Sequence, residues 1–266
     1  MLFRLHLLPC LLLAFTCCTA RAADVMEQAQ LKVFFVDVYL STAADSCAQK
    51  YPELRQQLLA AQQAFHQRLL PDIERGREVG RALVAPSGKD VDQMAQRIAD
   101  QNLATSFLTT PSSGIQRLCE DMLGKGKSPM QWSIDDFLRQ DFESLKMEVG
   151  NRQGLPCDYI VMSFEDLARR FLELRGLPPD TLELASLNLR LQLGDLKKKA
   201  SNCLAVQARA AEYRVAPDKE LGTAAELLSS MEAVLMPAWD SRAKTVESTT
   251  TVGKKVEEFL ARRVQK

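Results

Sequence analysis

The stretch LNLRLQLGDLKKKASNC, residues 187–203, decides whether the protein is purely helical or contains a sheet. Its leucines at 187, 189, 191 and 193 alternate with other residues, as they would in a buried strand. Against a strand, the stretch follows a helix start signal, and its residue types (Leu, Arg and Gln) favour helix. We therefore predict one long helix over residues 181–213, apolar on more than one face and hence buried in the middle of a bundle.

A second stretch, LKVFFVDVYLSTAADSC at residues 31–47, has the same spacing of a leucine followed sixteen residues later by a cysteine. A shift of 156 positions aligns residues 27–47 with residues 183–203, with six identities in twenty-one positions. The match could reflect an ancestral duplication of a helical unit, or chance between helices rich in Leu, Ala and Glu. The identical pairs are Glu27 with Glu183, Ala29 with Ala185, Leu31 with Leu187, Leu40 with Leu196, Ala44 with Ala200, and Cys47 with Cys203.

The rest of the chain also shows helical periodicity. Apolar residues recur three and four positions apart over residues 31–38 and 54–73, where Pro71 is expected to kink or end the second helix. Serine or aspartate followed three residues later by an acidic residue indicates helix starts near residues 88, 134, 164 and 181. DYIVM at 158–162 resembles a strand but is too isolated to form a sheet. The predicted fold class is all-α: a multi-helix bundle, possibly of two packed helical units, stapled by disulfides.

The first 22 residues have the pattern of a secretory signal peptide. Arg4 precedes an apolar run from Leu7 to Cys18, and Ala20 and Ala22 supply the small residues of a cleavage site. The alternative, an uncleaved anchor, is disfavoured because the run is shorter than the roughly 20 residues that span a bilayer. No other stretch approaches that length, so we expect a mature chain without a transmembrane segment, in the periplasm or secreted.

Cleavage would leave four of the seven cysteines: Cys47, Cys119, Cys157 and Cys203. An even number in an exported chain favours two disulfides over free thiols. A zinc site is disfavoured because the chain lacks closely spaced cysteine pairs. If the two similar helices belong to comparable units, the cysteine of each helix should form a disulfide within its own unit. This gives the pairs Cys47–Cys119 and Cys157–Cys203.

Charge and composition limit the partners and the domain plan. The mature chain has 244 residues (266 minus 22), with 32 basic and 34 acidic residues, and this net charge near −2 gives no reason to bind nucleic acid.

We predict a signal peptide at 1–22, an N-terminal helical unit at 23–127 and a C-terminal helical unit at 128–266. The boundary lies in the Gly-, Lys- and Pro-bearing segment 124–132. Gly76 and Gly80, four residues apart, could let another helix approach closely.

Residues that carry chemistry are scarce. The mature chain has one histidine, His66, and lacks the usual hydrolase, phosphate-binding, zinc and dinucleotide motifs. We therefore predict no catalytic, cofactor-binding or metal-ligating residues. The hypothesis is an exported binding, adaptor or inhibitor-like component of the bacterial envelope whose partner is another envelope or secreted protein. The bacterial assignment rests on the short signal and the absence of N-x-S/T sites.

The alternative is a helical hydrolase with a carboxylate active site between the two units. Three carboxylates that converge on a pocket would favour that enzyme, whereas an exposed apolar surface would favour the binding protein.

Overall fold

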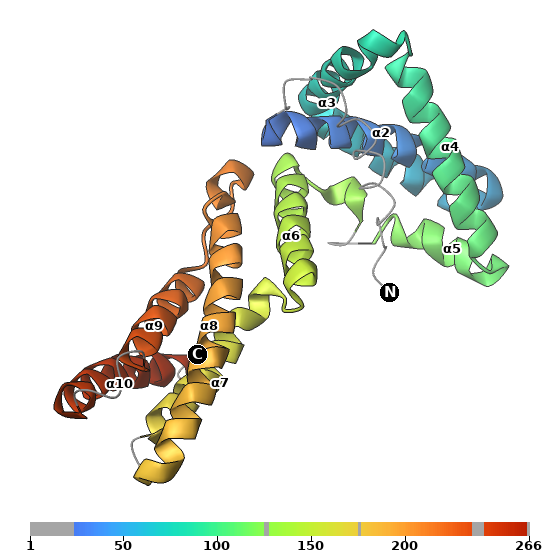
Figure 1. Ribbon diagram of the computed structural model, residues 1–266. Coiled ribbons are helices and arrows are strands. Elements are labelled where there is room, and N and C mark those ends of the chain that lie inside the picture. The colour runs from blue at the N-terminus through green and yellow to red at the C-terminus, as the bar shows by residue number, and fades with distance from the viewer. Residues whose placement is uncertain (1–23, 125–127, 175–176, 236–241, 265–266) are drawn as a thin grey trace. The chain divides into compact units, whose positions relative to one another are not determined.

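A computed structural model describes residues 24–124, 128–174, 177–235 and 242–264. Within these ranges every regular element is a helix, which confirms the predicted all-α fold class (Figure 1). None of these helices is long and apolar enough to cross a membrane. The predicted signal peptide, residues 1–22, lies outside the described residues.

The chain divides into two compact units, residues 1–140 and 141–266. The division falls inside α6 (Ile134–Gln153), whereas the expected boundary was 127/128. The 3-10 turn Pro129–Gln131 and Phe137 of α6 belong to the first unit, because Met130 and Phe137 are buried in its core. Residues 128–132 therefore pack within the first unit rather than linking two units.

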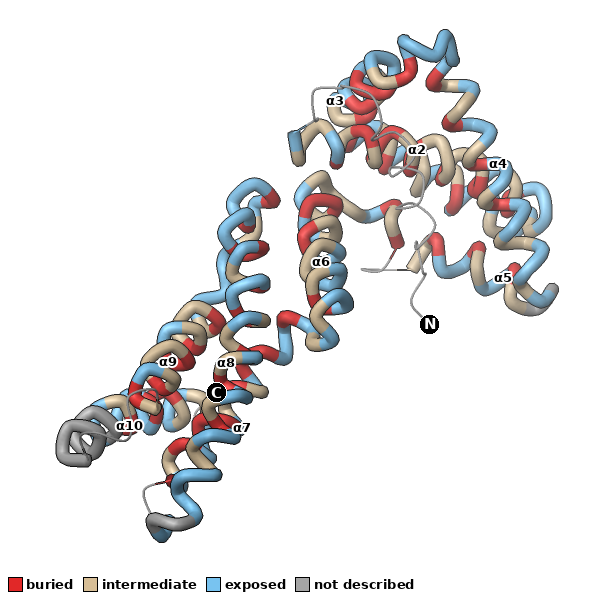
Figure 2. The backbone as a smooth tube through the Cα atoms, in the orientation of Figure 1, coloured by how far each residue is buried: buried red, intermediate tan, exposed pale blue. Residues whose placement is uncertain are grey.

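The first unit is built around α2 (Val25–Lys50), which contacts α3 (Arg55–Val84), α4 (Val91–Thr109) and α5 (Ser112–Asp121). The apolar periodicity correctly predicted the buried faces of α2 and α3. Phe34, Phe65 and Ile73 belong to these faces and are fully buried where the two helices meet. Figure 2 shows buried stretches in red along both helices. The core of this unit is thus a seam along α2.

Pro71 does not end its helix, because α3 runs through it from Arg55 to Val84. A proline inside a helix removes one backbone hydrogen bond and crowds the preceding turn. In α3 the residues on both sides, Leu69 and Ile73, are buried against the core of the first unit. Tertiary packing therefore holds the helix together where local preference would interrupt it.

The second unit contains the end of α6 and four further helices: α7 (Ile160–Glu173), α8 (Pro179–Gln207), α9 (Lys219–Leu235) and α10 (Arg242–Val264). α7, α8 and α9 contact one another, and α10 packs on α7 and α9. Phe164, Phe171, Leu193 and Leu228 are buried at the centre of this unit. The strand-like DYIVM stretch forms a 3-10 turn, Cys157–Tyr159, followed by the first turn of α7.

The start signal at Ser133 correctly predicted where α6 begins. The other helices with a predicted start begin a few residues away from it. Ser133 and Asp136 form a reciprocal cap, in which the Ser133 amide donates to Asp136 Oδ2 at 2.8 Å. At the start of α4 the cap is Asp90 instead of Ser87, because Asp90 Oδ1 accepts from the amides of the second and third residues that follow it. Ser163 lies inside α7, so the predicted start near 164 was wrong: the turn after Pro156 already begins the helical path.

Each unit contains one disulfide. Cys47 of α2 and Cys119 of α5 have sulfur atoms 2.01 Å apart, and Cys157 and Cys203 of α8 have sulfur atoms 2.11 Å apart. This is the pairing that the two-unit interpretation predicts. However, Cys47 pairs with a later residue and Cys203 with an earlier one, and Leu31 is buried whereas its counterpart Leu187 is half exposed. The two units therefore do not repeat one topology.

Far-ultraviolet circular dichroism of residues 23–266 should show the double minimum of α-helix with little strand signal. The expectation follows from the helical state of α8, whose alternating leucines are the most strand-like pattern in the sequence. A spectrum dominated by sheet would contradict the fold, with α8 as the first element to be reassigned.

Candidate functional site

α8 has an apolar face on each side, and only one of them is buried. Leu189, Leu193 and Leu196 are 4%, 0% and 5% exposed in the core of the second unit. Leu184, Leu187 and Leu191, on the opposite side, are 63%, 50% and 66% exposed. The prediction that α8 is buried in the middle of a bundle was therefore wrong. Burial on all sides needs neighbours on all sides, whereas Leu189, Leu193 and Leu196 share one core cluster with residues of α7 and α9.

We call Leu184, Leu187 and Leu191 the leucine stripe. Their spacing of three and four residues places them in one line along the helix. Contacts with neighbouring helices mark the limits of the exposed face. Arg170 of α7 donates to Gln192 Oε1 at 3.1 Å on one side, and Lys197 donates to Glu232 Oε2 of α9 at 2.7 Å on the other.

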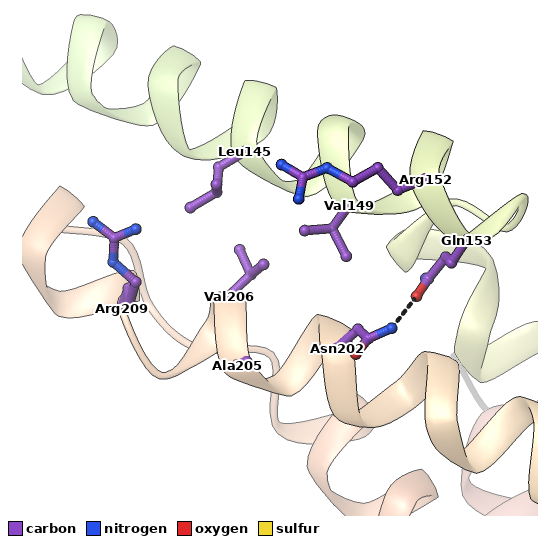
Figure 3. Close-up of a pocket in the computed structure, with 8 residues that line it drawn as sticks. All are labelled: Leu145, Val149, Arg152, Gln153, Asn202, Ala205, Val206 and Arg209. Carbon is purple, nitrogen blue, oxygen red and sulfur yellow. Dashed lines mark hydrogen bonds between the residues drawn. The ribbon is translucent and has the colours of Figure 1, made fainter. Parts of the chain in front are cut away.

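Further along α8 a groove lies between this helix and the end of α6 (Figure 3). Its volume is about 380 Å³. Figure 3 shows Leu145 and Val149 of α6 pointing toward Val206 of α8, with Arg209 at one end and the Arg152 side chain running along α6 beside Val149. Its eight lining residues are Leu145, Val149, Arg152, Gln153, Asn202, Ala205, Val206 and Arg209, and none of them is a carboxylate.

The second disulfide holds the two walls of the groove together. Asn202 Nδ2 donates to Gln153 Oε1 at 3.2 Å across the groove. The Gln153 amide also donates to the Leu155 carbonyl at 2.9 Å and lies 3.2 Å from Cys203 Sγ. Because Cys157 is bonded to Cys203, the end of α6 is covalently tied to α8 within a few residues of the groove. The groove is therefore preformed.

The guanidinium groups of the two groove arginines use only some of their hydrogen-bond donors within the protein. Arg152 pairs with Glu148 one turn before it, and Arg209 pairs with Glu212 at 3.0 Å. Pairs of this kind on a surface stabilise a protein by less than about 1 kcal/mol, and each guanidinium has five N–H donors. Both arginines can therefore also donate to a carboxylate of a ligand.

His66, the one histidine outside residues 1–22, has a partner that the sequence did not reveal. Its Nδ1 lies 2.9 Å from Oδ2 of Asp37, whose side chain is only 9% exposed. The two residues are 29 positions apart, on α3 and α2. The available signal was a single acidic residue within the apolar run FFVDVY. In the first unit this pair connects two core helices.

The surroundings of Asp37 affect its ionisation. Burial raises the pKa of the Asp37 carboxyl, and the hydrogen bond and charge of His66, with the charge of Arg77, offset part of this rise. An acid whose pKa is raised by folding favours the folded state most below its unfolded pKa, and that contribution is lost as pH rises through the folded pKa. His66 therefore reduces the cost of a charged Asp37.

Replacing His66 with alanine should lower the free energy of unfolding by about 1–3 kcal/mol near pH ~7, because it leaves a buried carboxylate without its partner. The loss should be smaller near pH ~3, where Asp37 is protonated. Denaturant titrations at both pH values measure this difference. The double variant Asp37→Asn/His66→Ala buries no charge and should recover part of the loss. An equal loss at both pH values would contradict the assigned role of the pair.

No cluster of three or more potential metal ligands (His, Cys, Asp or Glu) occurs in the part of the chain that the structure describes. No protein-family model, no curated protein sequence and no solved structure matches this chain. The function must therefore be argued from the groove, the leucine stripe and the chemistry of their residues.

Proposed function

We propose that the protein is an exported binding or adaptor component of the bacterial envelope, and that the groove between α6 and α8 holds a segment of another envelope or secreted protein. The observation that supports this most is the composition of the groove. Its lining combines the apolar side chains of Leu145, Val149 and Val206 with two arginines, Arg152 and Arg209. This arrangement suits a peptide segment with an apolar side chain next to an acidic one.

The size of the groove supports a protein segment as the ligand. A volume of about 380 Å³ is at the small end of the usual range for ligand pockets and accommodates a few side chains. The apolar part would bury the ligand's apolar side chain, and the arginines would provide charge-assisted hydrogen bonds to its carboxylate. Because the disulfide holds both walls in place, little ordering of the groove is needed on binding.

The disulfide pairs also support export. Cysteines at bonding distance in both units suit an oxidising compartment such as the periplasm or the extracellular space. The hydrolase alternative gains no support from the groove, because its lining contains no carboxylate. Asp37, the buried carboxylate of the first unit, is engaged by His66.

A variant that fills the groove tests this proposal. Ala205→Trp places a large side chain in the lining, and Ala60→Trp introduces the same side chain at an exposed position of α3. Immobilised wild-type protein and both variants are exposed to a bacterial envelope extract, and the retained proteins are quantified. Wild type and Ala60→Trp should retain the same proteins, and Ala205→Trp should retain them at least about tenfold less well. Equal retention by all three proteins, or none by wild type, would contradict the proposal.

A further inference from the structure

We propose that Arg209, rather than Arg152, is the groove residue that provides the main contact with a carboxylate of the bound segment. This role belongs to the groove of the proposed function and rests on it. The two arginines differ in how firmly the guanidinium group is held, in which of its N–H groups are available and in where it lies.

The guanidinium of Arg209 is held from two sides. Its Nε and Nη2 donate to Glu212 Oε2 at 3.1 and 3.0 Å, and its central carbon lies 5.6 Å from the ring centroid of Tyr213. Tyr213 is only 8% exposed, and its ring centroid lies 5.5 Å from that of Phe142, which is buried in α6. A buried aromatic pair therefore supports the ring that contacts Arg209.

Arg152 is held less firmly. The contact that holds its guanidinium is with Glu148, one turn earlier on the surface of α6. Its side chain is 71% exposed, against 46% for Arg209. A ligand that used Arg152 would have to order a long side chain at a cost in conformational entropy. Arg209 is already ordered, so it offers a carboxylate a preorganised partner.

Glu212 uses one edge of the Arg209 guanidinium and leaves another for a ligand. A guanidinium has five N–H groups, and the contact with Glu212 uses the Nε–Nη2 edge. The Nη1–Nη2 edge can form a bidentate pair with a second carboxylate. Figure 3 shows these two terminal nitrogens pointing away from α8. Glu212 is half exposed, so water screens its repulsion of the second carboxylate.

Arg209 also lies next to the apolar part of the groove. Its backbone amide donates to the Val206 carbonyl at 3.0 Å, so it lies one turn beyond a residue of the lining. Leu145 and Val149 of α6 point toward Val206 from the other wall. An apolar side chain that lies among these three residues therefore has Arg209 within reach of a carboxylate on the same residue or on a neighbouring one.

N-acetyl-L-leucine is a suitable probe, because it carries an isobutyl side chain and a carboxylate on one carbon. A ligand of this size should bind with a dissociation constant in the millimolar range. N-acetyl-L-leucinamide is the matched control ligand, in which a neutral amide replaces the carboxylate. The NMR signals of the Val149 and Val206 methyl groups report both titrations of residues 23–266. The acid should bind at least about fivefold more tightly than the amide.

Arginine variants identify the residue that binds the carboxylate. Arg209→Gln should weaken binding of the acid at least about fivefold and leave binding of the amide within about twofold of wild type. Arg152→Gln should cause a smaller loss, of at most about twofold. Arg169→Gln is the matched control, because Arg169 is 58% exposed on α7 and does not line the groove. Equal binding of acid and amide to wild type, equal losses in Arg209→Gln and Arg152→Gln, or titrations that shift neither valine would overturn the proposal.

The retention experiment with envelope extract separates this role from the proposed function. Arg209→Gln should retain the envelope proteins at least about fivefold less well than wild type, as Ala205→Trp does for its own reason. If Ala205→Trp loses these proteins and Arg209→Gln retains them fully, the groove binds a protein segment and only the role of Arg209 is overturned. If Ala205→Trp retains them fully, the proposed function is contradicted, and the titrations still decide whether Arg209 binds a carboxylate.

Discussion

Removal of either disulfide, as Cys47→Ala/Cys119→Ala or as Cys157→Ala/Cys203→Ala, is expected to lower the free energy of unfolding by about 4 kcal/mol. A disulfide restricts the unfolded chain, and the two disulfides close loops with sequence separations of 72 and 46 residues. The logarithmic dependence on loop length makes the two losses nearly equal. Urea titration of each double variant beside wild type provides the measurement.

Alanine is the suitable replacement because all four cysteines are at most 6% exposed and a serine would bury a hydroxyl group. Wild-type protein treated with a reductant should lose at least as much stability as either double variant. Stability that is unaffected by removal of a pair would show that this disulfide does not form in the protein.

Gly76→Ala should lower the free energy of unfolding by about 3 kcal/mol. A Cβ atom at position 76 would lie 2.0 Å from the backbone oxygen of Gln30 and 3.0 Å from the amide nitrogen of Leu31. These are backbone atoms of α2, so the clash can be relieved only by moving one helix away from the other. Such a movement would open the seam between α2 and α3, which contains much of the core of the first unit.

The control for this variant is Gly222→Ala in α9. Apart from the backbone of its own helix turn, no atom lies within 4 Å of the Cβ position at Gly222, so alanine should raise stability by about 0.5–1 kcal/mol through its better helix propensity. Thermal or urea unfolding of the two variants therefore should give changes of opposite sign. A Gly76→Ala protein as stable as wild type would contradict the close approach of α2 and α3.

The sequence predicted features that depend on local spacing. Helices follow from apolar residues three and four positions apart. The spacing of Gly76 and Gly80 allowed a close helix but did not predict one, and in the structure the backbone of α2 lies close to Gly76. The burial of α8 could not be predicted in this way. Its two leucine faces are equally apolar in sequence, and only the placement of α7 and α9 determines which of them is buried.

The groove and the Asp37–His66 pair were missed for a related reason. Val149 and Val206 come from helices 57 positions apart in sequence, and neither position carries a motif. Asp37 and His66 are joined by the packing of α2 on α3, which brings together residues 29 positions apart. Contacts of this kind depend on how helices pack, and a single sequence does not specify that packing.

The central claim of two helical units, each closed by its own disulfide, is tested most directly by peptide mapping of the protein without reduction. The second of these disulfides also holds the groove walls together. Mass spectrometry of the proteolytic fragments should find Cys47 linked to Cys119 and Cys157 linked to Cys203. A fragment that links Cys47 to Cys203 would contradict both the pairing and the division into two units.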